Sequence, residues 1–204
     1  MEKIDFKKKY KNLYLPSAKE PVVVDVPEMQ FAMVDGEGYP GTSKEYMDSM
    51  MVLYGLAYTL KFTSKLSGGP DWTIPPLEGL WWADDMEAFG DESRKEEWKW
   101  TSMIMQPDFV TQDQFEAASK QLKEKKNPEG LEKARLEKYN EGLCVQIMHI
   151  GPYTEEAPTI QKLHQFAEDN GYSLRDKHHE IYLGDPRRTA PDKLRTVIRQ
   201  PVSK

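Results

Sequence analysis

Residues 143–153 read Leu143-Cys144-Val145-Gln146-Ile147-Met148-His149-Ile150-Gly151-Pro152-Tyr153. The first eight residues are mostly apolar and predict a strand, and the glycine and proline that follow predict a turn. A helix over about 155–170 is expected next, with Ile160, Leu163 and Phe166 on its buried side and Gly171 as a left-handed stop. A hairpin over about 172–185 and a last strand over 196–199 complete this half.

The N-terminal half repeats this order of elements. Residues 22–34 are β-branched or apolar and predict a strand, which the Gly- and Pro-rich residues 35–41 end. Thr42-Ser43-Lys44-Glu45 matches a capping box, so a helix is expected from there to about Phe62. Its apolar residues at three- and four-residue steps predict one buried face, made of Met47, Met50, Met51, Tyr54, Tyr58 and Phe62. A deformable pocket wall is the alternative for the methionines.

Two similar halves predict an internal duplication. Gly38-Tyr39-Pro40 occupies the place in the first half that Gly151-Pro152-Tyr153 occupies in the second. We therefore expect an α+β fold of two βαββ units packed side by side, with a ligand cleft between the halves. The first unit is expected over about 22–106 and the second over about 142–202, within a single domain spanning 1–204.

The segment that connects the two halves, about 111–139, is predicted to be helical. Thr111-Gln112-Asp113-Gln114 is a second capping box, and Phe115, Ala118 and Leu122 form the apolar stripe of the helix that follows. A short third helix is predicted from the spacing of Leu131, Ala134, Leu136 and Tyr139.

Composition excludes several classes of protein. The 34 acidic and 28 basic residues give a net charge of −6, which argues against direct nucleic-acid binding. A single cysteine, Cys144, excludes an internal disulfide and a cysteine-based zinc site. The N-terminus lacks the apolar region of a secretory signal, and no segment has the ~18 apolar residues of a membrane span. A cytoplasmic protein without membrane attachment is expected.

Neither a cofactor nor a metal is expected. Gly36-Glu37-Gly38 lacks the spacing of a dinucleotide fingerprint. His178 and His179 are adjacent, and neighbouring residues on a strand point to opposite faces, so they do not form a ligand pair.

The tryptophans are the most unusual feature of the composition. All five lie between Trp72 and Trp100. Such a cluster either fills part of the hydrophobic core or lines a binding site for flat or cationic ligands. Trp81 and Trp82 are expected on opposite faces of a strand, so one of them is core; Trp98 and Trp100 share a face, which is either core or pocket.

Three segments resemble the GyrI-like small-molecule-binding family: His149–Tyr153, Glu180–Pro186 and Leu194–Val202. Relatives in that family are effector-binding domains of multidrug-responsive regulators, a gyrase-modulating protein, and hydrolases that open the cyclopropane of DNA-alkylating compounds. The resemblance is to the single-domain, cyclopropane-hydrolysing branch. It implies a ligand site centred on Glu180 of the Glu-x-Tyr pattern, with Tyr182 beside it, and an aromatic cage to which Trp81-Trp82 contributes.

The resulting hypothesis is a protein that binds flat hydrophobic or cationic molecules and hydrolyses cyclopropane-containing alkylating compounds. Glu180 and Tyr182 are the predicted catalytic residues, because a carboxylate in an aromatic cleft can hold or accept a proton. The predicted ligand-binding residues are Trp81, Trp82, Trp100, Tyr153 and Tyr54, although Tyr153 could equally well only join strand to helix. Two alternatives stay open: a non-catalytic binder of cationic lipophilic ligands, and a topoisomerase-modulating interaction protein.

Overall fold

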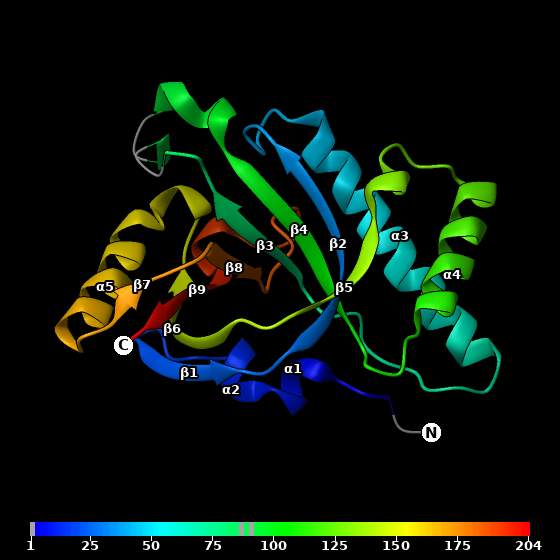
Figure 1. The fold of residues 1–204 in the computed structure, drawn as a ribbon, viewed down its shortest axis with the longest axis horizontal. Helices are drawn as coiled ribbons and strands as arrows, with labels where there is room; N and C mark the ends of the chain where they lie inside the picture. The colour runs from blue at the N-terminus through cyan, green and yellow to red at the C-terminus, as the bar shows by residue number, and fades with distance from the viewer. Residues whose placement is uncertain (1–2, 86–87, 90–91) are drawn as a thin grey trace. The chain divides into compact units, whose positions relative to one another are not determined.

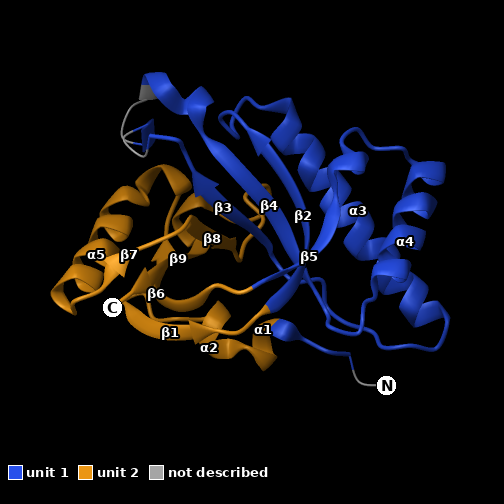
Figure 2. Ribbon diagram, viewed as in Figure 1, with its two compact units in different colours: residues 1–6, 29–139 blue, residues 7–28, 140–204 orange. Residues whose placement is uncertain are grey.

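The computed structural model describes residues 3–85, 88–89 and 92–204. The chain divides into two compact units, shown in Figure 2: unit 1 is residues 1–6 and 29–139, and unit 2 is residues 7–28 and 140–204. Each unit combines helices with an antiparallel sheet, which confirms the predicted α+β class (Figure 1). Among the described residues, the helices are too short or too polar to cross a membrane.

The described residues of unit 1 form four strands. They are β2 (Met29–Glu37), β3 (Leu77–Trp82), β4 (Lys99–Gln106) and β5 (Arg135–Tyr139). β4 pairs with β3 on one side and with β2 on the other, and β2 also pairs with β5, all antiparallel. The order within the unit is therefore β3-β4-β2-β5.

Two helices cover this sheet. α3 (Lys44–Leu66) packs on β2 and β4, and α4 (Gln112–Lys125) packs on α3. The α4 prediction is confirmed: Thr111 and Gln114 form a reciprocal capping box, and Phe115, Ala118 and Leu122 are buried. α3 begins one residue later than predicted, because Ser43 rather than Thr42 accepts the amide of Tyr46 and caps the helix.

The predicted buried face of α3 is wrong. Five of its six residues are exposed: Met47, Met51, Tyr54, Tyr58 and Phe62. The helix instead buries Val52, Leu53, Leu56, Ala57 and Leu60. Apolar side chains surround this helix, so their spacing did not distinguish the two faces. The packing of α4 against α3 distinguishes the two faces. At Gly55 of α3 the two helices are so close that a β-carbon would lie 2.8 Å from the Leu122 side chain of α4.

The strands of unit 2 also pair antiparallel. The short helices α1 (Phe6–Lys9) and α2 (Lys11–Tyr14) precede β1 (Val22–Val26). β1 pairs with β6 (Gly142–Ile150), β6 with β9 (Arg195–Ser203), and β9 with β8 (His178–Tyr182). α5 (Ala157–Asp169) packs on β6 and β9. The core beneath it contains Val145, Ile147, Leu163, Ala167, Ile198 and Val202.

Three further predictions about elements need correction. The third connecting helix is a 3-10 turn at Leu131–Lys133 followed by strand β5, whose partner β2 is about 100 residues away in sequence. The hairpin over 172–185 does not form, because β7 (Ser173–Leu174) and β8 both pair with β9 rather than with each other. Residues 22–34 form two strands, β1 and β2, which belong to different units.

The duplication is visible in the order and pairing of the strands. In unit 1 the order β2-α3-β3-β4 places the last strand between the other two. In unit 2 the order β6-α5-β8-β9 does the same. Each unit is thus a βαββ element with the same connectivity.

Candidate functional site

The candidate site of unit 2 is organised by strand β8. Alternation places His178, Glu180 and Tyr182 on one face of this strand and His179 and Ile181 on the other. The second pair is fully buried, whereas the first three side chains keep some exposure. The Glu-x-Tyr spacing therefore aligns the two predicted catalytic side chains.

Both carboxylate oxygens of Glu180 have partners. The Tyr182 hydroxyl donates to Oε2 at 2.8 Å, and His178 Nε2 lies 3.2 Å from Oε1. The Glu180 side chain is 16% exposed, so it can still be reached from outside. The ring of Tyr153 lies edge-on to Tyr182 with 5.5 Å between centroids, so a third predicted residue joins the group.

A second carboxyl group, Glu156, lies next to Glu180. It immediately precedes α5, and it is only 5% exposed. Burial, and after it the negative charge of Glu180, raises the pKa of Glu156 to about 9. Its Oε1 has no hydrogen-bond partner among the described residues. Glu156 is therefore a neutral acid at pH 7, next to the more exposed carboxylate of Glu180.

His164 extends this group of titratable side chains along α5. Burial, followed by the nearby charge of His178, lowers the pKa of His164. Its Nε2 is buried without a hydrogen-bond partner in the part of the chain that the structure describes. His164 is therefore held in its neutral form at pH 7.

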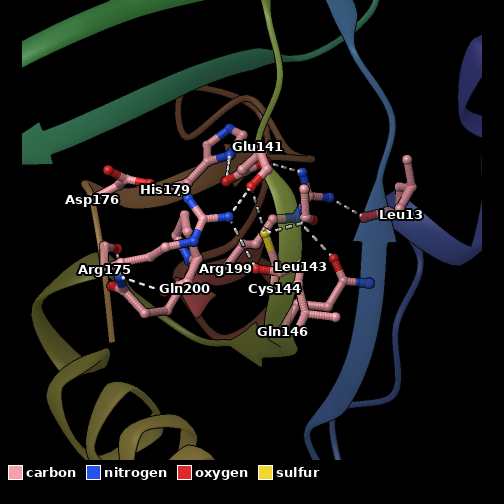
Figure 3. A network of polar contacts seen from close by, with 12 residues as sticks. Leu13, Glu141, Leu143, Cys144, Gln146, Arg175, Asp176, His179, Arg199 and Gln200 are labelled. Carbon is pink, nitrogen blue, oxygen red and sulfur yellow. Dashed lines mark hydrogen bonds and ion pairs between the residues drawn. The ribbon is translucent and has the colours of Figure 1, made fainter. Parts of the chain in front are cut away.

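The opposite face of β8 carries a buried ionic network (Figure 3). His179 Nδ1 lies 2.8 Å from Glu141 Oε1, and Arg199 donates to Glu141 Oε2 at 3.0 Å. Arg199 also donates to Gln146 Oε1 at 3.0 Å and to the Leu13 carbonyl at 2.9 Å. The three charged or titratable side chains are at most 3% exposed.

The network keeps Glu141 ionised. Burial alone would raise the pKa of Glu141, but His179 and Arg199 together outweigh it and hold the pKa at about 2. An ionised carboxylate only accepts hydrogen bonds, so the Nδ1 of His179 carries a hydrogen that it donates. Because His179 and Arg199 are paired residues of β8 and β9, this network joins the two strands behind Glu180.

The family assignment rests on nearly the whole chain. The family model described as a GyrI-like small-molecule-binding domain matches residues 19–203. The chain belongs to the GyrI-like family. This confirms the resemblance seen in the sequence.

Solved structures agree with the GyrI-like assignment. An uncharacterised conserved protein from Listeria innocua is 42% identical, with a TM-score of 0.92 over 98% of this chain and all of that one. A hydrolase from Listeria innocua is also 42% identical, with a TM-score of 0.87 over 98% of this chain and 100% of the other. The C-terminal domain of EcmrR is 14% identical over 91% of this chain and 98% of that domain, and its TM-score of 0.54 indicates a shared fold alone. A search of curated proteins finds no match.

The other predicted ligand-binding residues of this GyrI-like chain lie in unit 1. Trp81 and Trp100 are cross-strand partners on β3 and β4, both buried, and both contact Tyr46 of α3, at 5.8 and 5.2 Å between ring centroids. Their position under α3 favours a role in the core. Trp82 points to the opposite face of β3 and is partly exposed. Tyr54 lies on the exposed side of α3.

A hollow of ≈ 300 Å³ in unit 1 contains none of the predicted residues. Its lining includes Lys44, Glu45, Asp48, Glu129 and Lys133. These charges compensate one another: Lys44 pairs with Asp48 at 2.6 Å and with Glu129 at 2.5 Å, and Lys133 pairs with Glu45. Within the described ranges, no three His, Cys, Asp or Glu side chains are arranged to hold a metal ion.

Sequence reasoning missed Glu156 and Glu141. Pro158 marks the start of α5 and so places Glu156 at the helix entrance, but nothing local indicates that this carboxyl is buried. Glu141 precedes a strand in a polar turn, where an exposed carboxylate is the ordinary expectation. The expected divergence of His178 and His179 is confirmed: one contacts Glu180 and the other Glu141.

Proposed function

We propose that this GyrI-like protein binds flat hydrophobic small molecules and hydrolyses cyclopropane-containing alkylating compounds at Glu180. The observation that carries the proposal is the reachable Glu180 carboxylate that accepts a hydrogen bond from the Tyr182 hydroxyl at 2.8 Å. The nearby Glu156, whose pKa burial raises to about 9, supports it. Groups in different protonation states at one position are what acid–base catalysis requires. The 42% identical hydrolase from Listeria innocua supports a hydrolytic reaction.

The chemistry follows from the strain of the three-membered ring. A proton given to a carbonyl oxygen conjugated with the cyclopropane makes a ring carbon electrophilic. Water then adds to that carbon, the carbon–carbon bond breaks, and a carboxylate takes the surplus proton of the water. Glu180 is the reachable carboxylate of the site, and Tyr182 fixes its orientation.

Turnover is tested by incubating the protein with a compound in which a cyclopropane is fused to a cyclohexadienone. Chromatography with mass spectrometry should detect the water adduct with the wild type and not with Glu180→Gln. Glu168→Gln is the matched control, because Glu168 lies on α5 of the same unit and is exposed. Equal adduct formation by wild type and Glu180→Gln would refute the proposal.

A non-catalytic binder of cationic lipophilic molecules is the second candidate. The observation that favours it is the pair of aromatic rings, Tyr153 and Tyr182, next to the Glu180 carboxylate, an arrangement that suits a cation. Equilibrium dialysis should then show binding of the cyclopropane compound without its conversion. N-methylacridinium should bind more tightly than neutral acridine at pH 8, and Glu180→Gln should remove this preference.

A further inference from the structure

The outer face of helix α3 is apolar over about four turns. The large apolar side chains that it exposes, at steps of three or four residues, are Met47, Met51, Tyr54, Tyr58 and Phe62. Residues at these steps lie above one another on one face of a helix. The other sides of α3 pack on β2 and β4 and against α4 (Figure 1). We call these five exposed side chains the α3 stripe.

The α3 stripe differs from the outer face of the neighbouring helix α4. That face of α4 carries exposed charged residues such as Glu116 and Lys120, as a helix in contact with water usually does. In α3, no residue from Ser49 to Leu60 carries a charge. Tyr58 and Phe62 stack on each other with 6.1 Å between ring centroids, so this part of the stripe is ordered within a single chain.

The area of the α3 stripe matches one side of a homodimer interface. Its five side chains are between 37% and 57% exposed. With full areas of about 200 Å² each, they leave roughly 500 Å² of apolar surface in one patch, which is large for a monomer. Homodimer interfaces are about 65% apolar, so this patch is the apolar part of roughly 800 Å² per chain, the usual size of a specific interface.

The order of residues along the α3 stripe makes it complementary to a second copy of itself in antiparallel orientation. A two-fold axis at Tyr54 places Met51 opposite Tyr58 of the partner subunit, and Met47 opposite Phe62 of the partner subunit. Each of these contacts joins a flexible thioether to an aromatic ring, which is a favourable pair. The first four residues are spaced four, three and four apart, as contact positions are in paired helices.

We propose that the α3 stripe is a self-association surface, through which two copies of this chain form an antiparallel dimer with two-fold symmetry. The area and the residue order of the stripe both fit a second copy. A helix that lies on a lipid surface carries lysine or arginine beside its apolar face, whereas residues 49–60 of α3 contain neither and the chain has a net charge of −6. The dimer goes beyond the proposed hydrolysis and does not depend on it.

Sedimentation velocity of the full chain measures the dimer directly. Between about 1 and 100 μM the mass of the wild type should rise to that of two chains, in 1 M as in 0.15 M sodium chloride, because apolar contacts are not screened by salt. Tyr58→Glu buries an unpaired charge at two points of the interface and should weaken dimerisation by about 100-fold or more. Ala117→Glu adds the same charge to the exposed face of α4 and should dimerise as the wild type does.

Two results of this measurement would overturn the proposal. One is a wild type that stays monomeric up to about 100 μM, whether or not it binds phosphatidylcholine vesicles. The other is a Tyr58→Glu variant that is folded by far-UV circular dichroism and dimerises as tightly as the wild type.

A mixing experiment tests the antiparallel orientation. Met51→Lys and Tyr58→Glu should each be monomeric alone, but an equimolar mixture should form dimers, because the lysine of one chain then faces the glutamate of the other. In a parallel dimer Met51 would face Met51 of the partner subunit, and mixing would restore nothing. A mixture that remains monomeric would refute the antiparallel dimer.

Discussion

Replacing Glu141 by glutamine should remove an acid-sensitive part of the stability of unit 2. The pKa of Glu141 in the folded protein is about 2, against an ordinary value of 4.5, because His179 and Arg199 outweigh its burial. A group with a lowered pKa stabilises the fold fully above its unfolded pKa and loses that contribution as the pH falls toward its folded pKa. The pH window is therefore about 4.5 down to about 2.

The magnitude follows from the separation of the two pKa values. A difference of about 2.5 between the unfolded and folded pKa values of Glu141 corresponds to a contribution of at most ~3 kcal/mol to the free energy of unfolding at pH 7. In Glu141→Gln, Arg199 also loses its counter-charge in a buried position, which adds a cost at every pH. We expect the variant to be ~3 kcal/mol less stable than the wild type at pH 7, and this difference in the free energy of unfolding to narrow toward pH 2.5.

Urea denaturation followed by far-UV circular dichroism at several pH values measures this gap. Tryptophan fluorescence alone is unsuitable, because all five tryptophans lie between residues 72 and 100, in unit 1. Glu20→Gln is the matched control: Glu20 belongs to unit 2 and pairs with Lys162 at 3.2 Å, but its side chain is 77% exposed, so the pair contributes little. A gap that stays constant from pH 7 to pH 2.5 would refute the electrostatic reasoning.

Three other substitutions test the structure at separate points. Arg199→Met leaves the buried Glu141 carboxylate without its cation and should cost ~3–5 kcal/mol in urea denaturation; a neutral effect would contradict it. Gly36→Ala places a β-carbon 2.3 Å from the buried ring of Trp100, so unit 1 should lose ~1–3 kcal/mol, measured by tryptophan fluorescence. Tyr182→Phe removes the donor to Glu180 Oε2 and should lower kcat/KM about tenfold without destabilising the fold.

Local signals predicted the elements whose ends are set locally. The Thr111/Gln114 capping box of α4 depends on residues three apart, and it is present as predicted. Strand β6 follows an apolar run, and the stop at Gly171 has the positive φ of 72° that a left-handed position requires. In each case the information lies within a few residues of the feature.

The wrong predictions, for β5 and for the buried face of α3, concern features that are set by contacts with distant segments. The spacing of Leu131, Ala134 and Leu136 predicts a helix, whereas β5 is a strand because it pairs with the distant β2. The prediction for the buried face of α3 is wrong because apolar side chains surround the helix, and packing against β2, β4 and α4 decides which of them are buried. Both depend on contacts that spacing along the chain does not encode.

The residues of the candidate site also fall into those that local sequence predicts and those that it does not. Glu180 and Tyr182 are two apart on one strand, so their adjacency could be predicted from alternation. Glu156 could not, because its raised pKa arises from burial and from Glu180, which is 24 residues away in sequence and belongs to another element. A buried carboxyl at a helix entrance has the same local sequence as an exposed one.

The two faces of β8 depend on each other. A shift of this strand by one residue would turn Glu180 toward Glu141 and His179 toward the candidate site. Two carboxylates would then meet in a buried position, and Glu141 would lose one of its two partners. The register that pairs His179 with Arg199 avoids this, and the same register presents His178, Glu180 and Tyr182 together. The buried network therefore stabilises unit 2 and also selects the strand register that brings Glu180 next to Glu156.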